Sequence, residues 1–175
     1  MESKTLFWLF LAAVIIIAGF SLFMVYFFLN HDYKRRRLEM LAKDNAEILK
    51  LRFQAYERLT LLLERLMPEA LILREQRHDM NCQAFHSLLL RTIRQEFNHN
   101  LAMQVYVTIH TWGKVSIARE KLIKLINTSA SRSKPDMPAL LLGKTIIEEA
   151  TPEVTYHFND ALNAIKSEIE SYYSR

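Results

Sequence analysis

Glycine and proline are scarce in this chain, with 3 and 4 among 175 residues, against the roughly 12% that average proteins contain. Few points therefore force a helix to break, and the many leucine, glutamate, lysine, arginine and alanine residues favour helices. The three glycines, Gly19, Gly113 and Gly143, are scattered. No glycine-rich phosphate loop exists, which argues against nucleotide hydrolysis and against a dinucleotide-binding fold.

Cysteine and an excess of surface charge are also missing. Cys82 is the single cysteine, so no internal disulfide can form, and this usage suits a reducing compartment. The net charge of +4 comes from one cluster, because residues 38–175 carry 18 Lys and Arg against 17 Asp and Glu. A chain without a general basic face is not expected to bind nucleic acid.

What the chain does have is a run of 24 uncharged residues, Leu6 to Leu29. A helix of that length spans about 36 Å, enough to cross a hydrocarbon core of about 30 Å with some tilt. The run is longer than the core of a cleavable signal peptide, and the residues after it, 30–33, offer no small-residue cleavage site. The sequence therefore predicts a transmembrane helix at 6–29, with residues 1–5 as a short external N-terminus.

A basic collar follows this span, formed by Lys34, Arg35, Arg36 and Arg37. By the positive-inside rule, the collar predicts that the C-terminal part is cytoplasmic and that the protein is single-pass. The collar also has the charge to bind anionic lipid headgroups, at about 1 kcal/mol per basic residue. Fixing the topology is the simpler interpretation, because a spanning helix needs no electrostatic help to stay in the membrane.

Residues 30–48 are predicted to form a basic juxtamembrane stalk, and residues 49–175 a cytoplasmic helical bundle. A heptad pattern runs through the stalk and into the bundle, weakened in its first half by Asn45 and Arg52. A second apolar stripe after residue 48 widens the face, as expected for a helix packed in a bundle. The candidate interaction seam consists of Leu38, Leu41, Ile48, Leu59, Leu62 and Leu66.

Several boundaries in the bundle are readable from capping residues. Pro68 ends the first helix, while the fold of residues 69–80 is not predicted. Asp79 or Asn81 caps a helix at 82–97, and Thr108 caps one at 109–127. Residues 129–135 are expected to be a linker, 138–150 a short helix, and Thr151-Pro152 the start of the last helix.

Candidate chemistry is limited to isolated histidines. His78, Cys82 and His86 are four residues apart, the spacing that places metal ligands on one helix face. A structural zinc site needs four ligands, however, and Asp79 as a cap would leave His78 outside the helix. His99, between two asparagines, is more typical of a helix end than of a general base. No catalytic, cofactor-binding or metal-binding residue is therefore predicted.

Three stretches of the sequence are shared with a known group of proteins: residues 51–59 (LRFQAYERL), 96–101 (EFNHNL), and 105–108 (VYVT) leading to Trp112. Together they resemble an uncharacterised family of short, single-pass, helical membrane proteins of Bacteroidota-type bacteria. The resemblance spans most of the chain. It implies a bacterial inner-membrane location and assigns no activity to any residue.

These observations predict an all-α protein: a single N-terminal transmembrane helix, a long stalk helix and a small helical bundle. As a hypothesis, the protein is a scaffold or adaptor that holds a protein partner or its own copies at the cytoplasmic face of the inner membrane, without catalysis or a cofactor. The alternatives are a membrane-tethered sensor or enzyme that uses His78, His86 and His99, and anionic-lipid binding through the collar.

Overall fold

The computed structural model describes residues 2–77, 79–150 and 152–173, without the side chains of residues 2, 4–6, 12–13, 31–35, 38–39 and 42. The described chain is all-α, as predicted, and divides into a unit that ends at Leu49 and a unit that begins at Lys50. Its seven helices are α1 (Glu2–Leu66), α2 (Pro68–Glu75), α3 (Cys82–His99), the 3-10 helix η1 (Leu101–Val105), α4 (Ile109–Ser131), α5 (Ala139–Glu149) and α6 (Pro152–Tyr173).

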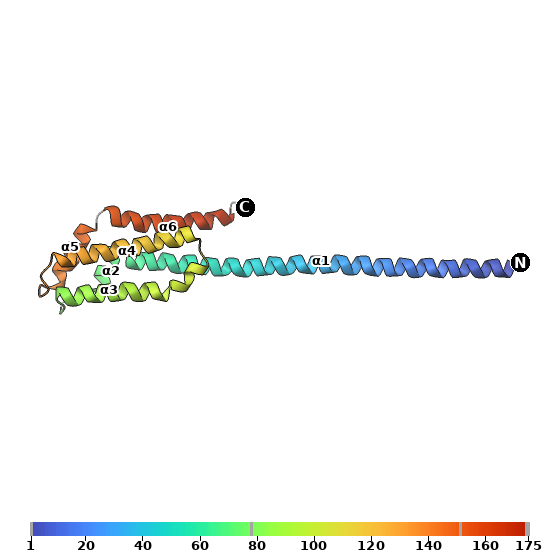
Figure 1. Ribbon diagram of the computed structural model, residues 1–175, viewed down its shortest axis with the longest axis horizontal. Helices are drawn as coiled ribbons and strands as arrows, with labels where there is room; N and C mark the ends of the chain where they lie inside the picture. The colour runs from blue at the N-terminus through green and yellow to red at the C-terminus, as the bar shows by residue number, and fades with distance from the viewer. Residues whose placement is uncertain (1, 78, 151, 174–175) are drawn as a thin grey trace. The chain divides into compact units, whose positions relative to one another are not determined.

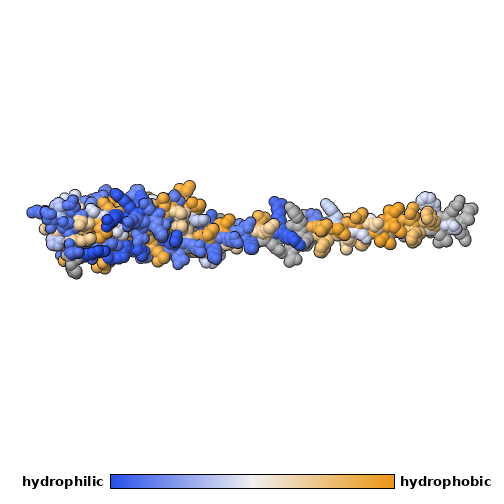
Figure 2. Space-filling model, turned by 90° about the horizontal axis from the view of Figure 1, so that it is seen from below, coloured by the Kyte–Doolittle hydropathy of each residue, from blue (hydrophilic) through white to orange (hydrophobic). Residues whose placement is uncertain are grey.

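The first unit is helical throughout its described residues and contains the apolar segment Phe7–Asn30. The described side chains of this segment are exposed, and Figure 2 shows the segment as a mostly hydrophobic surface. The segment is long and apolar enough to cross a membrane, which is the property of a membrane anchor or of a signal sequence. Because the chain buries none of the described side chains of this segment, the segment is not part of the protein's hydrophobic core.

The second unit is a bundle in which four long helices alternate in direction: residues 50–66 of α1, then α3, α4 and α6 (Figure 1). The short helices α2 and α5 lie together at one end of this bundle, and η1 lies at the other end. Helix α4 packs along α6 and also against α3 and α5. Short connections between antiparallel neighbours are the usual topology of such bundles.

The bundle core draws apolar side chains from every α-helix of the unit. Fully buried members include Tyr56, Leu59, Leu63, Leu71, Phe85, Leu89, Ile93, Leu122, Ile146 and Phe158. At its edge the Phe97 ring lies 5.2 Å from the ring of Trp112, and the Arg119 guanidinium lies 4.0 Å from the centre of the Phe97 ring. Burial of each large apolar side chain contributes roughly 1.5–3 kcal/mol, so this core is sufficient to hold the unit together.

The cap residues fall where the sequence places them. The side chain of Asn81 accepts a hydrogen bond from the Ala84 N–H, and that of Thr108 accepts one from the Thr111 N–H. Pro152 is the first residue of α6, while Thr151 lies outside the described residues. Each cap satisfies a backbone donor that the first turn of a helix leaves unpaired.

The linker expected at 129–135 is partly wrong, because α4 continues to Ser131. Ser129 is completely buried, and its hydroxyl lies 2.7 Å from Glu149 Oε2 and 3.0 Å from the Leu125 carbonyl oxygen. Serine is a weak helix former on its own, so the local sequence favours a break. A carboxylate supplied by α5 satisfies the hydroxyl and allows the helix to continue.

Two connections of the bundle are joined to one another by backbone hydrogen bonds. The Cys82 N–H donates to the Met137 carbonyl at 2.8 Å, and the Ala139 N–H donates to the Met80 carbonyl at 2.9 Å. Residues 69–80, whose fold the sequence left open, contain most of α2, and α5 packs against this helix. At Gly143 a Cβ atom would lie 2.8 Å from Gln76 Oε1 and 3.1 Å from Ile72 Cγ2.

Candidate functional site

The described part of the stalk presents apolar side chains to solvent. Leu41 is 52% exposed and Ile48 is 51% exposed, so these two members of the predicted seam are available to another molecule. Arg36 and Arg37 of the collar are also exposed, while the side chains of Lys34, Arg35 and Leu38 lie outside those described. Exposed leucine and isoleucine at heptad spacing are typical of a helix that packs against a second helix.

The bundle half of the predicted seam has a different role. Leu59, Leu62 and Leu66 are buried in the chain's own core, at 2% exposure or less. The heptad pattern in this part of α1 is therefore satisfied by the hydrophobic core of the same chain, and these three residues are not a surface of the folded bundle. The seam that another molecule can reach is shortened to the stalk.

The structure brings His86 together with Asn127, whose Oδ1 lies 2.8 Å from His86 Nε2. Both line a cavity of about 340 Å³ that also contains the edge of Cys82. The Cys82 thiol is buried and donates to the Pro138 carbonyl oxygen at 3.5 Å. A nucleophilic cysteine needs a base that takes its proton, and here the proton is directed to a backbone carbonyl.

His99 lies apart from this pair. It is exposed at the end of α3, in an open cavity of about 540 Å³ that Arg91 and Glu96 also line, whereas His78 lies outside the described residues. Glu96 pairs with Arg65 of α1, so its carboxylate is already occupied. Within the described ranges, no three His, Cys, Asp or Glu side chains gather as metal ligands would.

A polar cluster joins three helices around the carboxylate of Glu168. It accepts hydrogen bonds from the Tyr56 hydroxyl at 3.0 Å, from the Thr108 N–H and hydroxyl at 3.0 and 2.8 Å, and from the Thr111 hydroxyl at 2.6 Å. One α6 side chain thus caps the first turn of α4 and holds α1 beside it, where a carboxylate also interacts favourably with the helix dipole. Arg52 and Tyr172 make a second bond between α1 and α6.

Tyr56 is almost completely buried within this cluster. Burial, with hydrogen bonding to Tyr172 and Glu168, raises the pKa of the Tyr56 phenol well above its ordinary value of 10. The phenol therefore stays protonated and acts as a donor. The four hydrogen bonds to the Glu168 carboxylate connect α1 and the start of α4 to α6.

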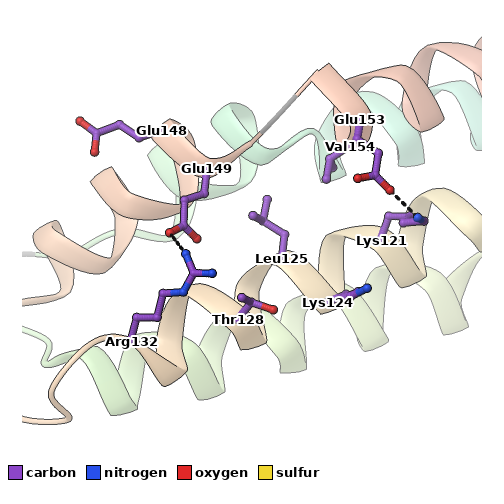
Figure 3. A pocket seen from close by; sticks show the side chains of 9 residues that line it. All are labelled: Lys121, Lys124, Leu125, Thr128, Arg132, Glu148, Glu149, Glu153 and Val154. Atoms are coloured by element: carbon purple, nitrogen blue, oxygen red, sulfur yellow. Dashed lines mark hydrogen bonds and ion pairs between the residues drawn. The ribbon is translucent and has the colours of Figure 1, made fainter.

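A cleft between α4, α5 and α6 has a volume of about 400 Å³ (Figure 3). Its apolar centre is formed by Leu125 of α4 and Val154 of α6, with the hydroxyl of Thr128 beside them. Charged side chains surround this centre: Lys121, Lys124 and Arg132 from α4, Glu148 and Glu149 from α5, and Glu153 from α6.

Two ion pairs close the ends of the cleft, as Figure 3 shows. Arg132 Nη1 lies 2.6 Å from Glu149 Oε1, and Lys121 Nζ lies 2.6 Å from Glu153 Oε1. The hydrogen bond and charge of Lys121 lower the pKa of the exposed Glu153 carboxyl, with smaller contributions from His157 and Lys124. Glu149 is held more firmly, because its second oxygen is bonded to buried Ser129.

Sequence reasoning did not find this cleft, because its residues come from three segments that are separated by a turn and by the α5–α6 connection. Only the spacing of Lys121, Lys124 and Thr128 along one helix face was a usable signal. At adjacent positions of α5, Glu148 is exposed and Glu149 is half-buried.

The architecture defines a class of protein: an apolar N-terminal helix followed by a packed helical bundle. Residues 3–172 match a family of unknown function, DUF7935, and the chain belongs to this family. The expected resemblance to an uncharacterised family is confirmed at this level, over nearly the whole chain. No curated protein matches the chain, and no solved structure does so either.

Proposed function

We propose that this protein is a membrane-anchored helical scaffold or adaptor of the bacterial inner membrane, as found in Bacteroidota-type bacteria. The apolar segment Phe7–Asn30 acts as a permanent single-pass anchor, and the bundle of residues 50–175 stands in the cytoplasm. The collar at Lys34–Arg37 sets this orientation and contacts anionic lipid. The stalk and the bundle bind a protein partner or further copies of the chain.

The observation that carries the proposal is the exposed apolar pair of the stalk, Leu41 and Ile48, on the same helix as the anchor segment. Copies anchored in one membrane have parallel stalks at the same depth. Residue 41 of one copy then faces residue 41 of the next, and the Asn45 side chains meet in the seam, where a paired asparagine favours an in-register dimer. The molecule that covers Leu41 and Ile48 in such a contact is a second copy of this chain.

Topology is tested with reporters that are fused after Arg175 and expressed in Bacteroidota-type bacteria. We expect a reporter that works only in the cytoplasm to be active, and one that works only in the periplasm to be silent. Washing membranes with alkaline carbonate should leave the protein in the pellet, and detergent should release it. A periplasmic signal, or a cleaved N-terminus with the chain in the soluble fraction, would contradict the anchor.

Self-association is tested by disulfide crosslinking in membranes, with Cys82→Ser as the background. Single cysteines at Leu41→Cys and Ile48→Cys should give covalent dimers on mild oxidation. Lys43→Cys is the matched control, because residue 43 lies on the opposite face of the same stalk. Equal crosslinking at all three positions would indicate random collision and would remove the seam from the proposal.

A further inference from the structure

Most charged side chains of the cleft between α4, α5 and α6 are paired within the described part of the chain, but two polar side chains are not. Lys121 is paired with Glu153, Arg132 with Glu149, and Glu148 with Lys144 at 3.6 Å. Within the described ranges, the structure places Lys124 in no ion pair and the hydroxyl of Thr128 in no hydrogen bond. Together with Leu125 and Val154, they form one cation and one hydroxyl beside an apolar surface.

The end of the cleft at Lys121 and Lys124 carries surplus positive charge. Two lysines approach a single carboxylate there, that of Glu153, and His157 lies near it as well. Lys124 and Thr128 are one helical turn apart, so both side chains start from the same face of α4 and line the cleft. An ammonium and a hydroxyl next to an apolar surface match a carboxylate that is attached to an apolar group.

The length of the cleft limits what this carboxylate belongs to. From Lys124 of α4 to Arg132, the residue that directly follows α4, the lining extends for about 12 Å at ~1.5 Å per residue. A small acid would cover only the end at Lys124, whereas about four extended residues of polypeptide would fill this length at ~3.3 Å each. The far end offers fixed polar groups, Glu149 and Arg132, to a peptide backbone.

We propose that this cleft binds the carboxy-terminal end of a partner polypeptide whose last residue is apolar. The terminal carboxylate pairs with Lys124 and accepts a hydrogen bond from Thr128. The last side chain lies on Leu125 and Val154, and the preceding residues extend toward Glu149. This gives the partner-binding part of the proposed function a location, and it holds or fails independently of the anchor and the stalk.

The test measures binding to the detergent-solubilised full-length protein by fluorescence anisotropy. The probe is the peptide Ala-Ala-Ala-Ala-Leu, labelled at its amino end, with either a free carboxylate or an amide at its carboxyl end. We expect the acid to bind with a micromolar to millimolar Kd and the amide at least tenfold more weakly. Lys124→Met, which keeps the apolar stem, should weaken binding of the acid about tenfold, and Thr128→Val several-fold.

Lys166→Met is the matched control, because Lys166 is exposed on α6 and does not line the cleft; its affinity should stay within twofold of wild type. Equal binding of acid and amide, or no effect of Lys124→Met, would overturn the site. N-acetyl-leucine binding as tightly as the peptide would overturn the polypeptide partner and indicate a small-acid site. Solubilised protein is measured throughout, so an error in the proposed topology leaves these outcomes unchanged.

Discussion

Glu168 shows at the scale of one residue how the bundle holds α1, α4 and α6 together. Its carboxylate accepts four hydrogen bonds from Tyr56, Thr108 and Thr111. In Glu168→Gln the amide NH₂ would face donors and leave part of the cluster unpaired. We expect a loss of about 1–3 kcal/mol in the free energy of unfolding, measured by urea denaturation. Glu57→Gln, an exposed change on α1, should have no measurable effect.

Tyr56 makes the stability of the bundle sensitive to alkaline pH. Its pKa is raised in the folded state above the ordinary value, so the unfolded chain loses this proton first. The stabilisation is complete below about pH 10 and decreases as the pH rises from there toward the folded-state pKa. Denaturation curves from pH 8 to 11 should show a smaller decrease in the free energy of unfolding for Tyr56→Phe than for wild type.

The exposed Tyr156 provides the comparison for this pH dependence. Tyr156→Phe should follow the wild-type curve, because the Tyr156 side chain is exposed and lies outside the Glu168 cluster. If Tyr56→Phe and Tyr156→Phe behaved identically, the alkaline loss would have to come from other groups.

Residues that act through neighbours in the sequence were predictable, and those that act across the fold were not. Thr108 and Asn81 could be identified as caps because capping is a property of three or four consecutive residues. Glu168, 60 residues beyond Thr108, reads as an ordinary surface glutamate in the last helix. Its role exists only once α6 lies beside the start of α4.

At the scale of helices, replacing either of two helical glycines by alanine is expected to change the stability of the bundle differently. A Cβ at Gly113 of α4 would contact nothing within 4 Å, so Gly113→Ala should stabilise by about 0.5–1 kcal/mol through helix propensity. At Gly143 of α5 the new Cβ would crowd Ile72 and Gln76. Gly143→Ala should therefore lower the melting temperature or leave it unchanged, whereas Gly113→Ala raises it.

The contrast between the two glycines tests the contact of α5 with α2. Thermal unfolding followed by circular dichroism measures both variants under one condition. A gain at Gly143 equal to that at Gly113 would mean that α5 has room to move away from α2, contrary to the close approach described above.

Helix boundaries were predictable where proline or a cap marks them, and failed where a distant partner overrides local preference. Pro152 correctly marks the start of α6. The serine-rich end of α4 was predicted to be a linker, because the sequence does not show the hydrogen bond between Ser129 and Glu149. The heptad pattern was correct as a helical signal. It could not show that Leu59 and Leu62 face helices of the same chain, because periodicity identifies an apolar face and does not identify what covers it.

At the scale of the whole molecule, the division after Leu49 predicts independent folding of the second unit. A fragment of residues 50–175 contains the complete buried core and should be soluble, strongly helical and cooperative in urea unfolding. We expect its midpoint of denaturation to match that of the bundle in the full-length chain. A fragment that is helical but unfolds without cooperativity would show that the first unit contributes to bundle stability.

The apolar N-terminal helix and the all-α class could be predicted from the sequence, because a 24-residue apolar run and a shortage of helix breakers are properties of the chain itself. The cleft was not accessible. Its charged ends and apolar centre depend on α5 and α6 returning to α4, and nothing local to Leu125 or Val154 distinguishes them from other core residues.

The single thiol of this protein is that of Cys82, whose side chain is 3% exposed and donates to the Pro138 carbonyl oxygen at the edge of the cavity that His86 also lines. Alkylation requires more of the sulfur to be exposed, so we expect the labelling rate to report local opening around the first turn of α3. Mass spectrometry measures this rate on the native chain, without an introduced probe.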